Sequence, residues 1–422
     1  MKRYESYKPS GILWIGEIPS HWEIRRNKYL FKEEDEKNND LIFQLLTFSR
    51  KKGIIPFNEA NEKDPSASDL SNYKVIHPGQ LLENRMQAWS GMFAKSEVDG
   101  CVSPDYSVFS PTSNNICVDY YAHLFRTNQY IAHWANLSRG VGDGFNRLYT
   151  NQFHSVYVLF PPHEEQKKIV EYLSSKTLRI DAQQRERERE LRLLDELKQA
   201  EIANVVTRGL NPDVPMKDSG IPWIGQIPAH WEVMRMKRIF SESDEKINRE
   251  GGMLLSLSQY TGITPKCESS KTGMFEAEST IGYNVVHPGQ FVMNIMLAWN
   301  GSYALSEYEG IISPAYSVFD FKIECEKKYF HYLLRLQAYA GAFKTQSRGI
   351  IESRLRLYPN QFYQFPCIVP PLKEQKAIVE YIEKKANTID DMIANLQAEI
   401  DFLTEYRQRL IADVVTGQVK ID

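Results

Sequence analysis

Polar and cationic side chains occupy matched turns in two similar stretches of the chain. LLTFSRKKGIIP at 45–56 aligns with LLSLSQYTGITP at 254–265, and ENRMQAWSG at 83–91 aligns with MNIMLAWNG at 293–301. The framework residues agree, whereas the polar side chains differ. Arginine suits guanine edges, glutamine and asparagine suit adenine, and lysine suits phosphate. The pattern predicts turns that contact DNA. The alternative is solvated surface loops that diverged after a duplication.

A second set of arginines follows a helical stretch in both copies. Arg139 directly follows Ser138 and precedes Arg147, and Arg348 and Arg356 repeat this arrangement. Phosphate contacts position a protein on DNA without specifying its sequence, so they suit a feature that both copies share. Ion pairs within the protein are the alternative. The candidate DNA-binding residues are Arg50, Lys51, Lys52, Arg85, Gln87, Arg139, Arg147, Gln259, Tyr260, Lys266, Asn294, Arg348 and Arg356.

The motifs of common catalytic chemistry are missing from the sequence. There is no G-x-x-x-x-G-K-[ST] loop for ATP. Asp105 could serve a metal-dependent nuclease, but the second copy has Ala315 in its place. Four histidines recur between the copies beside Trp or Pro, and we interpret them as structural: His21, His77, His230 and His287. We therefore expect no catalytic residue and no metal site, although sequence alone leaves a Ser/His/Asp arrangement open.

Length and composition restrict the class of protein. At 422 residues the chain is too long for one compact core and suggests two or three domains. Its 51 Lys and Arg against 54 Asp and Glu neither predict nor exclude nucleic acid, because binding needs only a local basic face. Five cysteines without a C-x-x-C pair favour reduced thiols in a cytoplasmic protein. No apolar stretch approaches a membrane span.

The chain is a tandem duplication. GILWIGEIPSHWEI at 11–24 returns as GIPWIGQIPAHWEV at 220–233, with ten of 14 positions identical. EQKKIVEY at 165–172 returns as EQKAIVEY at 374–381, and the offset stays at 209 or 210 throughout. Two large units fit this pattern better than a solenoid, which needs more and shorter repeats. The tryptophans of the first motif are expected to anchor the domain cores.

Each half combines a mixed domain with one long helix. Strands are predicted at 106–109 and 156–160 from β-branched and aromatic residues, and helical spacing marks 119–137 and 328–343. After the paired prolines, glycine and proline are absent for over 40 residues. The fold class is therefore α+β, with two homologous mixed α/β domains and two long helices. The predicted segments are a first domain at 1–160, a first spacer helix at 161–209, a second domain at 210–369 and a second spacer helix at 370–422.

Apolar residues in the second long helix follow the 4-3 spacing of a coiled-coil seam. They are Ile382, Ala386, Ile389, Ile393, Leu396, Ile400, Leu403, Leu410 and Val414. The first helix has a poorer seam, with Gln184 and Arg187 at seam positions. At 1.5 Å per residue each helix would be roughly 60 Å long. We expect the two helices to pair antiparallel, although spacing alone leaves a parallel pair open.

These motifs together resemble the specificity (S) subunit of type I DNA restriction–modification systems. The resemblance is carried by WIGEIPSHWE at 14–23 and WIGQIPAHWE at 223–232, and by the PPHEEQKKIVEYL and PPLKEQKAIVEYI stretches at 161–173 and 370–382. It covers both halves. It implies two target-recognition domains that each read half of a bipartite DNA site, with a gap set by the spacer helices.

The resemblance also implies partners and a division of chemistry. Two methyltransferase (M) subunits would bind S-adenosylmethionine and methylate adenine, while restriction (R) subunits would use ATP and Mg to translocate and cleave double-stranded DNA. This chain would hold no cofactor and would be noncatalytic. An alternative function from another class is a coiled-coil scaffold that carries two domains for protein or glycan ligands.

Overall fold

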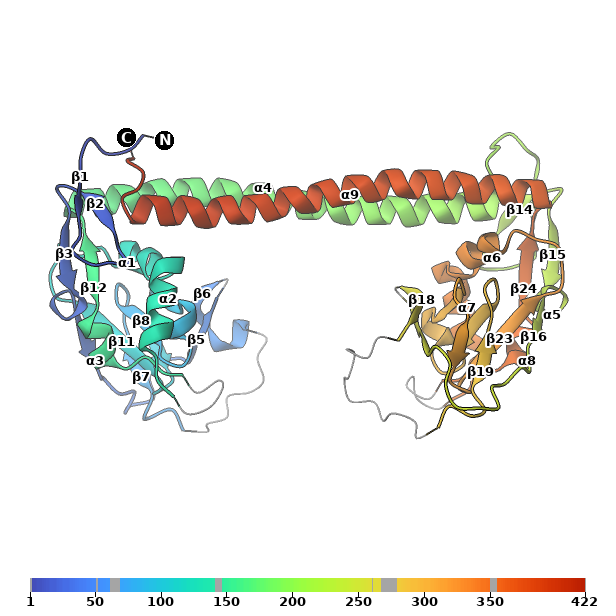
Figure 1. Cartoon of the computed structure of the whole chain (residues 1–422), viewed down its shortest axis with the longest axis horizontal. Helices are drawn as coiled ribbons and strands as arrows, with labels where there is room; N and C mark the ends of the chain where they lie inside the picture. Colours follow the sequence, from blue (N-terminus) through green and yellow to red (C-terminus); the bar gives the residue numbers. More distant parts are fainter. Residues whose placement is uncertain are drawn as a thin grey trace. The chain divides into compact units, whose positions relative to one another are not determined.

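A computed structural model of the chain describes residues 2–50, 52–60, 69–140, 146–259, 261–266, 279–349 and 355–421. Contacts group the chain into two compact units: residues 1–188 with 397–422, and residues 189–396. Each unit contains one globular part together with a segment of both long helices (Figure 1).

The first unit consists mainly of short strands. They are β1 (Tyr7–Pro9), β2 (Glu17–Pro19), β3 (Glu23–Arg26), β4 (Phe31–Glu34), β5 (Leu46–Ser49), β6 (Gly53–Pro56), β7 (Lys74–Ile76), β8 (Leu81–Asn84), β9 (Phe93–Lys95), β10 (Gly100–Val102), β11 (Tyr106–Pro111) and β12 (Tyr157–Phe160). The helices are η1 (Asn27–Tyr29), η2 (Phe57–Glu59), η3 (Ala88–Ser90), α1 (Val118–Leu124), α2 (Asn128–Leu137), α3 (Thr150–Ser155) and the long α4 (His163–Arg208), which continues into the second unit.

The second unit repeats these elements in the same order. Its strands are β13 (Met216–Asp218), β14 (Gln226–Pro228), β15 (Glu232–Arg235), β16 (Phe240–Glu242), β17 (Leu255–Ser258), β18 (Gly262–Pro265), β19 (Asn284–Val286), β20 (Phe291–Asn294), β21 (Tyr303–Leu305), β22 (Gly310–Ile312), β23 (Tyr316–Phe321) and β24 (Pro366–Val369). Its helices are α5 (Met236–Ile239), η4 (Ala298–Asn300), α6 (Lys327–Leu334), α7 (Gln337–Gln346), α8 (Pro359–Phe362) and the long α9 (Leu372–Val415).

A four-stranded antiparallel sheet forms the centre of each globular part. The strand order is β4-β11-β8-β9 in the first and β16-β23-β20-β21 in the second. The hairpins β5–β6 and β17–β18 and the pairs β3–β12 and β15–β24 complete matching arrangements. The predicted strands at 106–109 and 156–160 are confirmed as β11 and β12. The mixed α/β class is also confirmed.

The helical stretch predicted at 119–137 is two helices and not one. The chain leaves α1 after Leu124 and enters α2 at Asn128. The Thr127 hydroxyl donates to the Leu124 carbonyl over 2.8 Å, which satisfies an oxygen that a continuous helix would have bonded internally. The copy at 328–343 is divided in the same way into α6 and α7.

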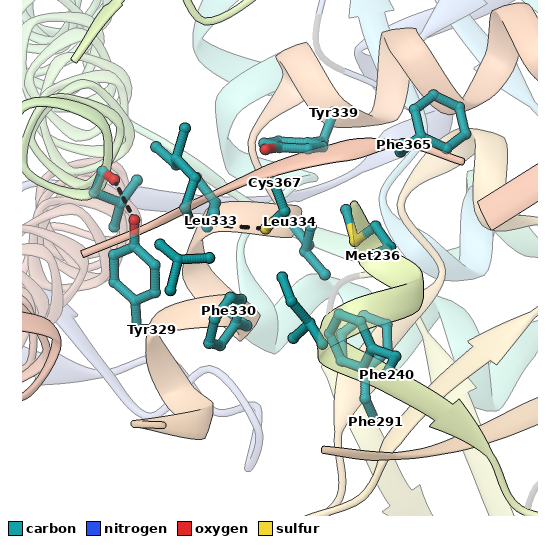
Figure 2. Close-up of a cluster of buried hydrophobic side chains, with 14 of the residues drawn as sticks. Met236, Phe240, Phe291, Tyr329, Phe330, Leu333, Leu334, Tyr339, Phe365 and Cys367 are labelled. Atoms are coloured by element: carbon teal, nitrogen blue, oxygen red, sulfur yellow. Dashed lines mark hydrogen bonds between the residues drawn. The ribbon is translucent and has the colours of Figure 1, made fainter. Parts of the chain in front are cut away.

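Aromatic and aliphatic side chains fill the core of each globular part. In the second part Phe240 and Phe291 from the sheet meet Phe330 of α6, with Phe362 of α8 stacked beside Phe291. Figure 2 shows this cluster and the Tyr329 hydroxyl, which donates to the Val206 carbonyl of α4 over 2.9 Å. Tyr120 does the same in the first unit, donating to the Val415 carbonyl of α9 over 2.7 Å. Each domain is therefore fixed to the end of the helix that comes from the other half of the sequence.

The long helices pair antiparallel within each unit. In the first, Arg187 of α4 contacts Glu399 of α9 at 2.8 Å, and in the second Lys198 contacts Asp390 at 2.6 Å. Within the first unit, Gln184 contacts Thr404 and Arg187 contacts Glu399, so the number on α9 falls as that on α4 rises and the pair is antiparallel, as predicted. The seam is confirmed too, since Ile382, Ile389, Leu410 and Val414 are buried. The polar seam residue Gln184 donates to the Thr404 hydroxyl over 2.7 Å.

The repeated W-I-G-x-I-P-x-H-W motif joins each domain to a helix end. Trp22 and Trp231 are fully buried, as expected of core anchors. Gly209 ends α4 with a φ of +76°, and an added Cβ there would lie 3.2 Å from the Trp231 ring. Gly417 follows α9 with a φ of +74° and approaches Trp22 in the same way. A glycine is needed at both positions because the backbone is left-handed and an indole ring lies against it.

Candidate nucleic-acid interface

The tip of hairpin β5–β6 meets the η3 turn in the first unit. Arg50 lies at this tip and donates from Nη2 to the Ser90 carbonyl of η3 over 2.7 Å. Lys52 is exposed beside it, and Gln87 is exposed at the start of the η3 turn. All three side chains line one pocket together with Trp89. The structure therefore brings three of the sequence candidates together, whereas Lys51 lies outside the described residues.

Arg85 has a different environment from Arg50. Its Nη2 donates to Glu33 of β4 over 2.7 Å and its Nε donates to the Ser107 hydroxyl over 2.6 Å. Burial alone would raise the pKa of Glu33, but a hydrogen bond from Thr150 and the charges of Lys74 and Arg85 lower that pKa below its usual value. Arg85 is thus held in a part-buried ion pair, which is a structural role, and we leave it out of the interface proposed below.

A buried acid lies next to this ion pair. Glu83 of β8 is fully buried, and neither of its carboxylate oxygens has a hydrogen-bond partner among the described residues. Burial raises the pKa of Glu83 well above its usual value, although the nearby Arg85 charge acts in the opposite direction. Burial therefore favours the protonated form of this carboxyl group over the charged form.

The arginines after the second short helix are paired through the backbone. The Arg139 N–H donates to the Arg147 carbonyl and the Arg147 N–H returns the bond to the Arg139 carbonyl, both over 3.0 Å. Arg348 and Arg356 exchange the same two bonds over 2.9 Å. Residues paired in this way project their side chains to one side of the ribbon. The repeated motif therefore places two arginine side chains on the same side of the ribbon in each domain.

The residue type at the position that neighbours Arg147 differs between the two copies. Arg147 is 3.6 Å from Asp105, whereas the second copy has Ala315 at that position. Arg139 and Arg348 are exposed and Arg147 and Arg356 are half-buried.

The candidates of the second domain are scattered. Gln259 is half-buried at the β17–β18 tip, and its carbonyl accepts from Arg335. Lys266 is exposed after β18. Asn294 is 3% exposed, and its Oδ1 accepts from the Met296 N–H over 2.9 Å. Asn294 therefore shapes a turn and is too buried to reach a groove from this position. Tyr260 lies outside the described residues.

Sequence reasoning missed several residues of this region. Trp89 and Trp299 occur in the repeated A-W-[SN]-G turn and are partly exposed, with each indole N–H donating to the carbonyl of Met86 or Met296. Arg126 donates to the Arg50 carbonyl over 3.1 Å, as Arg335 does to that of Gln259. The tryptophans could have been found from the repeat, but the arginine contacts need the tertiary fold.

The recurring histidines contact carboxylates that belong to other segments. His21 contacts Glu165 and His230 contacts Glu374, at 2.8 and 2.7 Å, which joins the tryptophan motif to the first turn of α4 or α9. His77 lies between two carboxylates, with Nδ1 2.6 Å from Asp99 and Nε2 3.3 Å from Glu36. In the parts of the chain that are described, no group of His, Cys, Asp and Glu could hold a metal ion. No described helix is long and apolar enough to cross a membrane.

The family comparison gives this interface a context. Residues 19–192 match the family described as the type I restriction modification DNA specificity domain. This stretch spans the hairpin tip, the η3 turn and the first arginine pair. Residues 19–192 are therefore similar to a domain of the type I DNA specificity family.

Full-length relatives extend the comparison to both halves. The chain is 22% identical over 450 residues to a protein named as the type I restriction enzyme MjaX specificity subunit, covering 96% of each chain. It is 23% identical over 304 residues to the type I restriction enzyme MjaVIII specificity subunit, covering 67% of each. Both relatives come from Methanocaldococcus jannaschii. The predicted resemblance to type I specificity subunits is confirmed.

Solved structures share the fold. A chain from a study of complex assembly and conformational transition of the type I R-M system is 15% identical, with a TM-score of 0.69 over 95% of this chain and 99% of that one. The HsdS subunit from Thermoanaerobacter tengcongensis is 16% identical, with a TM-score of 0.54 over 95% and 98%. At this identity the likeness concerns the fold alone.

Proposed function

We propose that this chain is a DNA-recognition subunit that reads a bipartite site, with one half-site for each globular domain. The main support for this proposal is that the two domains share one framework but present different side chains at equivalent turns. Arg50, Lys52 and Gln87 in the first domain correspond to Gln259, Thr261 and Leu297 in the second. Different side chains at one position favour different bases, so the two half-sites differ in sequence.

Phosphate contacts would hold each domain in register on its half-site. The exposed arginines Arg139 and Arg348 occupy equivalent places in the two domains, beside Arg147 and Arg356. An arginine binds phosphate in a bidentate manner and carries its charge at every physiological pH. Because these residues recur, they serve affinity and orientation, and the differing turn residues serve sequence choice.

The long helices would direct the partner subunits. An exposed apolar pair with i,i+4 spacing recurs on the outer face of both, as Leu193 with Leu197 on α4 and Phe402 with Tyr406 on α9. Residues at this spacing form one continuous patch on a helix. Two equivalent patches suit two copies of one partner, which we take to be the methyltransferase subunits. Restriction subunits would join this complex, and S-adenosylmethionine, ATP and Mg would be bound by the partner subunits.

Docking of the partners can be tested separately from DNA binding. The double variant Leu193→Glu and Leu197→Glu is expected to lower the number of bound methyltransferase subunits from about two to one, measured by mass photometry. Leu178→Glu is the matched control, because Leu178 is 65% exposed on the same helix but corresponds to the polar Asn387 in the second copy. An unchanged stoichiometry in the double variant would remove these patches from the proposal.

DNA recognition is tested by competition binding of the assembled complex. A duplex with both half-sites should bind on the order of 1,000-fold more tightly than unrelated DNA at physiological salt. Replacing either half-site should remove most of that preference. Equal affinity for all duplexes would contradict the proposed function and favour the scaffold alternative.

A further inference from the structure

The first domain contains a pocket of about 600 Å³ between hairpin β5–β6 and the η3 turn. Its floor is apolar, because Phe48 and Met92 are buried there. Arg50 and Lys52 lie at its polar side, and none of the described residues that line it carries a carboxylate. The pocket therefore combines an apolar interior with local positive charge, which suits a flat, uncharged ring attached to an anionic group.

Trp89 supplies an aromatic surface in this pocket. It is 41% exposed, although its ring is fixed by the hydrogen bond from Nε1 to the Met86 carbonyl over 2.9 Å. The adjacent Arg50 is fixed as well, because its guanidinium donates to the Ser90 carbonyl. A preorganised aromatic face next to a fixed cation is the arrangement that binds an unstacked nucleobase and its phosphate.

The equivalent tryptophan of the second domain, Trp299, is less exposed than Trp89 and has a cation over its ring. Lys344 of α7 places its Nζ 5.3 Å from the centre of the Trp299 ring. The first domain has Ala135 at the position of Lys344, on α2, and a methyl group cannot reach across the ring. Gln87 is likewise replaced by Leu297. Among the described residues, the more exposed indole and the amide at these two positions therefore belong to the first domain.

We propose that this pocket takes an unpaired adenine from the first half-site, a proposal that rests on the function proposed above. The base stacks on Trp89, its hydrogen-bonding edge faces the amide of Gln87, and its phosphate contacts Arg50 and Lys52. The glutamine amide offers one donor and one acceptor, which complement the N6 and N7 edge of adenine. The second domain reads its half-site without extracting a base.

A mismatch scan with the assembled complex tests this proposal. Extracting a base is cheaper when its pairing is already lost, so a mismatched partner opposite the extracted adenine should tighten binding by about tenfold. Each adenine of the first half-site is therefore offered with a mismatched partner, and affinity is measured by competition. The methylated adenine is excluded, because a methyltransferase itself extracts its target base.

Matched variants connect any gain to this pocket. Ala135→Lys places on α2 the cover that α7 provides in the second domain, at an exposed position where the fold is not disturbed. Ala135→Lys and Trp89→Ala should both abolish the gain in affinity. Lys344→Ala and Trp299→Ala should leave it unchanged.

The outcomes separate this proposal from the one on which it rests. If the complex selects the bipartite site but no mismatch tightens binding, or if the gain survives in Ala135→Lys, the pocket does not take a base and the proposed function stands. If the complex binds all duplexes alike, the proposed function fails and the pocket proposal fails with it.

Discussion

Glu83 and Met293 occupy the same strand position in the two domains, each opposite a buried serine. Glu83 of β8 is paired with Ser107 of β11, and Met293 of β20 is paired with Ser317 of β23. One framework thus accommodates either a carboxyl group or a thioether at its centre. The comparison supplies a natural replacement for an acid whose oxygens have no partner among the described residues.

Glu83→Met should therefore stabilise the first unit by about 1–3 kcal/mol, because an unpartnered polar group is replaced by an apolar one of similar length. The pH dependence follows from the raised pKa. A carboxyl group whose folded pKa lies above its unfolded value contributes stability in full below about pH 4.5 and loses it as pH rises through the folded pKa. Urea unfolding from pH 4 to 9 should show a weaker loss of stability with rising pH in the variant. If the variant instead lost stability more steeply with rising pH than the wild type, the raised pKa of Glu83 would be contradicted.

His77 and His287 each lie between two carboxylates, and these contacts should make the stability of the protein depend on pH in the range where histidine titrates. The hydrogen bond to Asp99 raises the pKa of His77, and hydrogen bonds to Glu245 and Glu309 raise that of His287. Their stabilisation is thus complete below about pH 6.5 and decreases as pH rises through the raised pKa values. Thermal melting of the double variant His77→Asn and His287→Asn should be less pH-dependent than that of the wild type between pH 6 and 8. If the melting temperatures of the variant and the wild type change equally with pH, the two histidines do not contribute to the pH dependence.

The coiled-coil seam should carry much of the stability of the helix pair. Ile389 is 3% exposed, and Ile389→Ala should cost about 2–4 kcal/mol through lost burial and a cavity. Met392, three residues further along α9, is 49% exposed, and Met392→Ala should cost less than about 0.5 kcal/mol. Urea unfolding of the two variants measures the difference. Equal losses would place Ile389 outside the seam.

The arginine pairs and the turn residues should have separable effects on DNA binding. Arg139→Ala should weaken binding to all sequences about equally and reduce the slope of log affinity against log salt by about one. Competition binding between 50 and 200 mM salt measures this. A loss restricted to one sequence would make Arg139 a base-reading residue.

Gln87→Ala should instead relax selection at one position of the first half-site by about 1–3 kcal/mol. Leu297→Ala, at the equivalent turn, is the control and should leave the first half-site unaffected. Affinities for a set of single-base variants of both half-sites give the result. Uniform weakening across the set would assign Gln87 to the phosphate backbone.

The large-scale organisation could be read from the sequence because it is periodic. The constant offset identified the duplication, and the 4-3 spacing identified the residues that are buried between α4 and α9. What the spacing could not give was the partner of each polar seam residue. Gln184 and Arg187 interrupt the apolar spacing in the sequence. In the antiparallel pair, however, Gln184 contacts Thr404 and Arg187 contacts Glu399.

The candidate interface was less predictable, because residue type does not reveal distant partners. Arg85 is held by Glu33, 52 positions earlier, through a strand register that only the folded sheet defines. Asn294 belongs to a polar turn in sequence, yet it is buried at the end of β20. Ala135 of α2 corresponds in sequence to Lys344, and the significance of this difference emerges only because α2 packs on the η3 turn.

Modification mapping of genomic DNA tests the central claim most directly. Cells that express this chain with its methyltransferase partner are compared by long-read sequencing with cells that lack this chain. The account predicts a new two-part motif that carries methyladenine in each half and disappears without this chain. If the complex assembles and the partner binds S-adenosylmethionine but no such motif arises, the recognition role is contradicted.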